Sequence, residues 1–304
     1  MPTSGGAGIV LRLRHRAEAL ALRGVYVAVR ALPLDVASAV GGWLGRTFGY
    51  RLRRTHVARS NLRSVFPDKS AAEIEIIVRG MWDNLGRVAF EYPHLDRFRV
   101  FNGDGRFEVI GIEHFDALRD DGEPGIMFSG HLGNWELLGP AAAARGAPLN
   151  LVYRAPNNPR LQWLFDLRRS SGARMLPKGA DGAKEALKLL KNGAHFAMLV
   201  DQKMNEGVPA PFFERDAMTA PALALFAFRF RCPVLPARVE RVGGARFRIT
   251  VLPPMEFEWT GDRHADVLAA MTKVNAVLEE WIRERPEQWL WLHRRWPDAT
   301  DTSR

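Results

Sequence analysis

The chain of 304 residues is 47% hydrophobic and 25% charged, a globular composition that excludes a disordered protein and suits one large α/β domain or two small ones. Its formal net charge of +9 indicates an anionic partner, such as nucleic acid, anionic lipid, a phosphorylated substrate or an acidic protein. The only cysteine, Cys232, excludes an intrachain disulfide and fits a reducing compartment.

The first 63 residues are strongly basic and contain a long apolar segment. They hold eleven arginines but only two acidic residues, Glu18 and Asp35. The apolar segment, residues 24–45, is long enough to cross a bilayer, but Arg30, Pro33 and Asp35 interrupt it. A charged residue at the centre of a spanning helix costs about 2.5–3.5 kcal/mol. We therefore expect residues 1–58 to form a basic amphipathic helical segment that lies on an anionic membrane surface.

Two other interpretations of this segment are open. A signal peptide would also begin with basic residues and end in small ones, but charges inside the apolar run argue against it. Alternatively, residues 1–58 form two ordinary core helices with solvated arginines, which would still allow contact with a membrane.

The next segment has the pattern of an amphipathic helix. Ser70 and Glu73 have the spacing of a capping box. Apolar residues then recur at helical spacing up to Val88. The helix should end before Pro93, because the residue before a proline disfavours helical conformation.

After residue 101 the sequence alternates between strands and helices. We predict strands at residues 106–111, 125–130, 149–154 and 195–201, helices at 114–120, 134–146, 158–172, 181–193, 221–231 and 265–286, and a hairpin at 233–254. This order predicts an α/β domain at residues 59–304, with a mixed, largely parallel sheet flanked by helices.

Polar residues follow three of the predicted strands. His131, Arg154 and Asp201 each come at or just after a strand end, and sites in such sheets gather at the carboxyl ends of strands. A strand can also end in a polar residue simply because it reaches the surface, and Arg154 and Asp201 could form a structural ion pair.

His131 and Glu136 are five positions apart, a spacing that would make them diverge on a regular helix. Gly130 and Gly133 bracket the histidine, and Asn134 is a plausible N-cap. His131 would then lie in a loop and Glu136 in the first helical turn, where the two side chains can meet. A carboxylate bonded to one imidazole nitrogen makes the other more basic. The alternative is a structural loop histidine and a glutamate favoured by the helix dipole.

Several stretches together resemble a known family. They are RSNLRSVFP (59–67), SGHLGNWE (129–136), VYRAPNNP (152–159), AMLVDQ (197–202) and RPEQWLWLHRRW (285–296). The chain resembles the bacterial lipid A biosynthesis acyltransferases, the late lauroyl/myristoyl enzymes, over roughly residues 10–300. These belong to the H-x-x-x-x-D/E glycerolipid acyltransferase superfamily.

The resemblance implies transfer of a fatty acyl chain from an acyl-carrier-protein thioester to a hydroxyl of a lipid A precursor, a late secondary acylation in lipopolysaccharide biosynthesis. The location implied is the cytoplasmic face of the bacterial inner membrane. His131 would be the general base, oriented by Glu136, without a covalent acyl-enzyme. No cofactor, metal or nucleic acid is implied. The substrate-binding residues would be Asn134, Tyr153, Arg154, Asn158, Asp201 and either or both of Arg168 and Arg169.

Two other functions are open for this chain. The chain could instead be an acyl-CoA-dependent phospholipid or glycolipid acyltransferase, or a non-enzymatic basic protein that binds membranes or nucleic acid.

One segment differs from the family pattern. After Phe212 and Phe213 the chain has ERDAMTAP, where the family usually has a glycine. Residues 289–297 mix tryptophans with arginines, and we interpret them as a strand that alternates core tryptophans with solvated charges. An interfacial belt or a nucleic-acid surface would have a similar composition.

Overall fold

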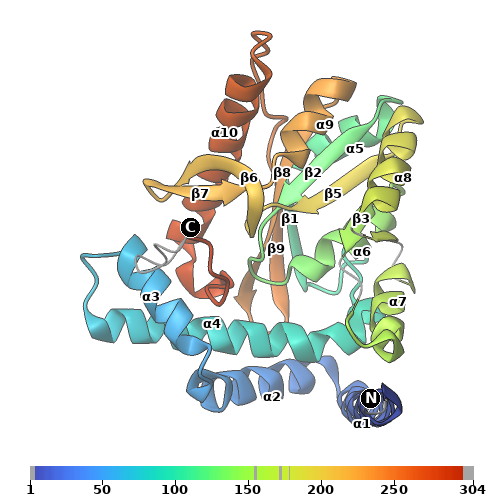
Figure 1. Ribbon diagram of the computed structural model, residues 1–304, viewed down its shortest axis with the longest axis vertical. Coiled ribbons are helices and arrows are strands. Elements are labelled where there is room, and N and C mark those ends of the chain that lie inside the picture. The colour runs from blue at the N-terminus through green and yellow to red at the C-terminus, as the bar shows by residue number, and fades with distance from the viewer. Residues whose placement is uncertain (1–3, 154–155, 171–172, 178, 297–304) are drawn as a thin grey trace.

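The centre of the molecule is a seven-stranded sheet (Figure 1). The computed structural model describes residues 4–153, 156–170, 173–177 and 179–296. The strand order is β1-β9-β8-β2-β5-β3-β4, and neighbours are parallel except in the β8–β9 hairpin. The strands are β1 (Phe107–Ile110), β2 (Gly125–Ser129), β3 (Asn150–Tyr153), β4 (Arg174–Pro177), β5 (His195–Leu199), β8 (Val234–Gly243) and β9 (Arg246–Val251). The predicted mixed, largely parallel sheet is confirmed, although β4 was not predicted.

Helices flank the sheet on both faces, as the alternating sequence predicts. They are α5 (Ile112–Asp120), α6 (Leu138–Ala144), α7 (Gln162–Ser170), α8 (Ala180–Lys191), α9 (Ala222–Phe230) and α10 (Arg263–Glu284). Every residue of β2 is buried, because β5 and β8 pair with it and helices cover the sheet. One apolar core includes residues of α4, α9 and α10, and a second includes residues of α5 and α6.

Helices α2 (Leu34–Thr47) and α4 (Ala71–Glu91) run side by side across one end of the sheet (Figure 1). The capping box predicted at Ser70 is present, with Glu73 as its partner. Glycines bring the two helices close together. A Cβ atom on Gly45 would lie 1.9 Å from the carbonyl oxygen of Trp82, and one on Gly86 would lie 2.1 Å from that of Gly41. The α2–α4 contact therefore depends on glycine at these positions.

The N-terminal helix α1 (Ser4–Ala31) ends just before Pro33, and α2 follows; the short helix α3 (Thr55–Val65) comes next. Among the described residues, no helix has both the length and the apolar character needed to cross a membrane. Several apolar side chains of α1 are exposed to solvent, among them Leu13, Leu20 and Val27. The predicted helical character is thus confirmed for Ser4–Ala31 and Leu34–Thr47, whereas membrane contact stays a proposal.

The Phe-rich segment after β5 forms a separate two-stranded antiparallel sheet, β6 (Lys203–Phe212) and β7 (Arg215–Thr219). We predicted no strands there, because the segment has few regularly spaced apolar residues. Phe213 and Glu214 connect the two strands with φ angles of 52° and 60°. Non-glycine residues rarely adopt such values.

The strand predicted in residues 289–297 is wrong. Apart from a single bridge between Leu132 and Trp289, the described residues after the 3-10 turn η5 (Pro286–Gln288) have irregular backbone. The three tryptophans are core residues as expected, but Arg295 is fully buried rather than solvated. Its guanidinium donates to the Met218 carbonyl and the Thr219 hydroxyl, and lies over the Phe212 ring. The β6–β7 hairpin covers this segment and so buries its charge.

Candidate active site

His131 and Asp201 meet at the carboxyl ends of two neighbouring strands. In the parallel pair of β2 and β5, Ser129 lies opposite Leu199, so the residues two positions further along also come together. The Nδ1 atom of His131 lies 2.7 Å from Oδ1 of Asp201. The backbone N–H of His131 donates to Oδ2 of the same carboxylate, also at 2.7 Å. Two of the three polar residues expected at strand ends, His131 and Asp201, therefore meet.

Asp201 is held as a buried anion. Its side chain is 2% exposed, and the indole N–H of Trp289 donates to Oδ2 at 2.7 Å. Burial alone would raise the pKa of this carboxyl group. The charge of His131 and the hydrogen bonds to the carboxylate oppose burial and lower the pKa to about 2. Asp201 is therefore ionised at neutral pH.

His131 presents its second ring nitrogen away from Asp201. Its Nε2 atom lies 3.3 Å from the side-chain nitrogen of Gln202, and its ring contacts that of Trp135 with 5.0 Å between centroids. Burial alone would lower the pKa of His131, but the charge of Asp201 and the hydrogen bond to it outweigh burial and raise the pKa. A neutral imidazole that donates Nδ1–H to Asp201 carries its lone pair on Nε2, the arrangement that a general base requires.

Glu136 does not bind His131, which corrects the contact expected from the sequence. Its carboxylate accepts two hydrogen bonds from the guanidinium of Arg168, one of them 2.6 Å from Nε to Oε2. It also accepts one from the indole of Trp135 at 3.0 Å. The 3-10 turn η3 (Trp135–Leu137) directs Glu136 toward α7, whereas the preceding loop directs His131 toward β5. Glu136 still acts on His131 through space, because its charge also raises the histidine pKa.

The two arginines that the sequence could not separate lie on α7. Arg168 forms the ion pair with Glu136 and also lies over the rings of Tyr92 and Phe165, at 5.5 and 5.4 Å. The side chain of Arg169 falls outside the described residues, as does Arg154. Burial opposes the charge of Arg168, but Glu136 more than compensates and raises its pKa.

The side chains of Asn134, Asn158 and Tyr153, which were also predicted to belong to the site, form hydrogen bonds with other segments of the chain. Asn134 is fully buried and makes no capping bond with its side chain, which donates instead to Glu91 at 2.7 Å. Asn158 caps the turn η4 (Pro159–Leu161) and donates to the His15 carbonyl of α1 at 2.9 Å. Tyr153 accepts a hydrogen bond from Gln162 at 3.3 Å. None of these three side chains forms a hydrogen bond with His131.

The loop between His131 and Glu136 is anchored by residues that the sequence reasoning missed. Gly133 has a φ of +54°, and a Cβ atom there would lie 1.9 Å from the carbonyl oxygen of Val239. Its own carbonyl accepts from Asn84 at 2.9 Å, and its N–H donates to the Gln288 carbonyl at 3.1 Å. One available signal was the presence of Asn84 and Glu91, seven residues apart, on the apolar face of the helix predicted at residues 71–92.

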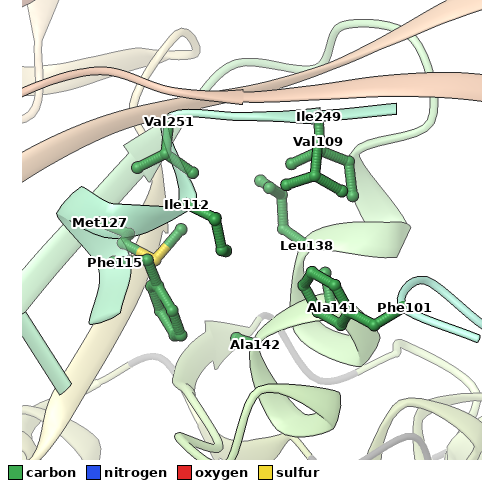
Figure 2. Close-up of a pocket in the computed structure, with 10 residues that line it drawn as sticks. All are labelled: Phe101, Val109, Ile112, Phe115, Met127, Leu138, Ala141, Ala142, Ile249 and Val251. Atoms are coloured by element: carbon green, nitrogen blue, oxygen red, sulfur yellow. The ribbon is translucent and has the colours of Figure 1, made fainter. Parts of the chain in front are cut away.

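The apolar cavity shown in Figure 2 lies apart from these polar groups. It has a volume of about 20 Å³ and is lined by side chains from β1, β2, β9, α5 and α6 and by Phe101. Its ten lining residues are all apolar. The cavity therefore supplies no acid, base or nucleophile, and the chemistry of the candidate site belongs to the strand ends.

The chain is similar to known proteins over most of its length. A family model described as bacterial lipid A biosynthesis acyltransferase matches residues 10–298. The lipid A biosynthesis lauroyltransferase of Escherichia coli K12 is 30% identical over 284 residues, which cover 90% of this chain and 89% of that protein. The palmitoleoyltransferase of the same organism is 27% identical over 276 residues, covering 87% and 86%. Its myristoyltransferase is 25% identical over 280 residues, covering 90% and 83%.

Proposed function

Because this chain belongs to the bacterial lipid A biosynthesis acyltransferases, we propose that it transfers a fatty acyl chain from an acyl-carrier-protein thioester to a hydroxyl of a lipid A precursor. Membership of this family already makes the chain an acyltransferase and sets aside the non-enzymatic alternative. The donor, the catalytic residues and the location belong to the proposal.

The bond between Asp201 and Nδ1 of His131 is the observation that carries the mechanism. It leaves Nε2 of His131 as the atom that takes the proton from the acceptor hydroxyl. The hydroxyl oxygen then attacks the thioester carbonyl, and a tetrahedral intermediate forms. As the intermediate collapses, the carbon–sulfur bond breaks and the thiolate takes the proton back from His131. The acyl chain moves directly to the acceptor, without a covalent acyl-enzyme.

In this mechanism the two carboxylates have different roles. Asp201 orients the imidazole and stabilises the imidazolium that forms during attack. Glu136 adds negative charge near His131 and holds Arg168 in a fixed two-point geometry. Arg168 would bind substrate as the cation that steadies the thioester oxyanion or a phosphate of the acceptor. Tyr153 and Arg154 would belong to the acceptor side of the site.

The basic N-terminal helices support a position on the cytoplasmic face of the inner membrane. Exposed apolar side chains occur along α1 and near the end of α2, where Trp43 and Phe48 are about half exposed. Arg46 lies between these two residues in the sequence, and Arg51 follows them. Arginine beside exposed tryptophan and leucine is the combination that binds the interface of an anionic membrane. An acidic carrier protein would be drawn to the same basic molecule.

The function is tested with the purified full chain and four substrate combinations. Acyl-carrier-protein and acyl-CoA donors are each offered with a lipid A precursor and with a phospholipid acceptor, and products are identified by mass spectrometry. The proposal expects transfer from the carrier protein to the lipid A precursor. Preferred transfer from acyl-CoA to the phospholipid would favour the alternative function instead.

The roles of the residues are tested in the same assay. His131→Ala and Glu136→Ala should each lose most of the acyl transfer while binding to anionic vesicles persists. Full activity in His131→Ala would exclude this residue as the base. Full activity in Glu136→Ala would restrict the essential carboxylate to Asp201.

A further inference from the structure

Beneath the loop of residues 130–136 lies a buried ion pair that the proposed mechanism does not use. Glu91, at the end of α4, is fully buried, and Arg241 of β8 is 9% exposed. The guanidinium meets the carboxylate at two points, 2.5 Å from Nη1 to Oε1 and 2.9 Å from Nη2 to Oε2. The pair thus joins α4 to the sheet.

The same carboxylate receives two further hydrogen bonds, each from a different part of the chain. Asn134, within the loop, donates its amide to Oε2 at 2.7 Å. Ser38, on α2, donates its hydroxyl to Oε1 at 2.6 Å. Glu91 therefore connects the loop between His131 and Glu136 to α4, to β8 and to α2.

Arg241 extends the network to the neighbouring residue of the loop. Its Nε atom donates to Asn84 at 2.9 Å, and Asn84 in turn donates to the carbonyl of Gly133 at 2.9 Å. The side chain of Gln288 bonds both the N–H and the carbonyl of Arg241, at 2.8 and 2.9 Å. The loop is thus held at Gly133 and at Asn134 by one connected set of buried groups.

We propose that Glu91 is a positioning residue: with Arg241, its buried carboxylate holds the loop so that His131 and Glu136 reach Asp201 and Arg168. The proposal rests on the proposed function, since it assigns the loop to acyl transfer. Stability alone does not account for a buried ion pair, because replacing both partners by apolar residues often leaves a protein equally stable or more stable. Placing catalytic groups, by contrast, demands accuracy, and a misplacement of about 1 Å can cost about 100-fold in rate.

Two substitutions that each remove one donor to the same carboxylate test the proposal. Asn134→Ala breaks the bond on the side of the loop. Ser38→Ala breaks the bond on the side of α2 and serves as the matched control. Both variants leave the pair of Glu91 and Arg241 in place, so both should fold. Glu91→Gln is the second test, because a neutral amide presents a donor where the carboxylate now accepts.

The readouts are kcat, KM, thermal stability and backbone hydrogen exchange of residues 131–137 in the full chain. We expect Asn134→Ala to lower kcat at least tenfold, with KM within threefold of wild type, and to speed loop exchange at least tenfold. We expect Glu91→Gln to do the same. Ser38→Ala should keep kcat within threefold and leave loop exchange unchanged, at a similar melting temperature to Asn134→Ala.

Either of two results would overturn the positioning role. In one, Asn134→Ala keeps wild-type kcat. In the other, kcat falls equally in Asn134→Ala and Ser38→Ala, in proportion to lost stability. Failure of the proposed function is a separate result, because wild-type protein would then transfer no acyl chain. Even in a protein without acyltransferase activity, hydrogen exchange of residues 131–137 would show whether Glu91 holds the loop.

Discussion

Two carboxylates raise the pKa of His131, and they have different hydrogen-bond partners. Asp201 bonds its Nδ1 atom directly and is itself fixed by the indole of Trp289. Glu136 has Arg168 as its partner, so much of its charge is neutralised locally. Asp201 therefore has the larger influence on the orientation and basicity of His131.

The first prediction concerns Asp201→Asn and the pH dependence of acyl transfer. A general base must be neutral, so kcat/KM should rise with pH through the pKa of His131. Asp201 raises that pKa, and removing its charge should move the rising limb to lower pH. The amide can also donate to Nδ1 and favour the wrong tautomer, so the maximum should fall at least about 100-fold. Rate profiles across pH 5–9 measure both effects.

Glu136→Gln is the comparison for this prediction. Glu136 raises the histidine pKa less than Asp201 does, so the limb should move in the same direction by a smaller amount. If the rising limb of the pH profile did not move in Asp201→Asn, the result would contradict the assigned hydrogen bond between Asp201 and His131.

At the scale of elements, α2 and α4 pack as closely as glycine permits. The Cβ atom of an alanine at position 45 would lie 1.9 Å from the Trp82 carbonyl oxygen, whereas one at position 24 of α1 would meet nothing within 4 Å. The boundary predicted at residue 58, between the N-terminal segment and the α/β domain, stays a prediction. These contacts show that α2 packs closely against α4, which lies beyond that boundary.

The second prediction follows from this contrast. Gly45→Ala should lower the free energy of unfolding by about 1–3 kcal/mol, because the helices must move apart to admit a methyl group. Gly24→Ala makes the same chemical change in an open helix and should not destabilise, since alanine favours helix. Denaturant unfolding of both variants measures the difference. Equal stabilities would mean that α2 and α4 do not pack as closely as described.

The third prediction concerns the turn between β6 and β7. Glu214 is exposed and has a φ of 60°, a conformation that costs a non-glycine residue about 1–2 kcal/mol. Glu214→Gly removes this strain and should raise the free energy of unfolding by up to about 1 kcal/mol, after the added flexibility of the unfolded chain is subtracted. Glu214→Ala retains the strain and should give no gain. Thermal and denaturant unfolding distinguish the two variants.

At the scale of the whole molecule, charge and exposed apolar surface are both prominent in the N-terminal helices. Leu13, Leu20 and Val27 recur every seven residues on α1 and are 57%, 72% and 60% exposed. Such spacing places them in one stripe along the helix. The bond between Asn158 and the His15 carbonyl attaches this helix to the segment that leads into α7, which carries Arg168.

The fourth prediction is that this stripe binds anionic membranes. Wild-type protein should co-sediment with vesicles that contain phosphatidylglycerol, less with pure phosphatidylcholine, and less again as salt screens the arginines. Replacing Leu13, Leu20 and Val27 by serine should lower binding at least tenfold. Ile76→Ser, at an exposed apolar position on α4, should leave it unchanged. Undiminished binding of the triple variant would exclude the stripe as the membrane contact.

The sequence by itself predicted six of the seven strands of the central sheet, most helices, and the positions of His131 and Asp201 at strand ends. These depend on local patterns: buried apolar runs, helical spacing, capping residues and glycines. It did not determine the hydrogen-bond partner of His131, the role of Asn134 or the burial of Arg295. These features depend on which strands are neighbours in the sheet. His131 and Asp201 are 70 residues apart in the sequence, and only the parallel pairing of β2 with β5 brings their side chains together. Tertiary structure alone decided that Asp201 holds the histidine while Glu136 holds Arg168.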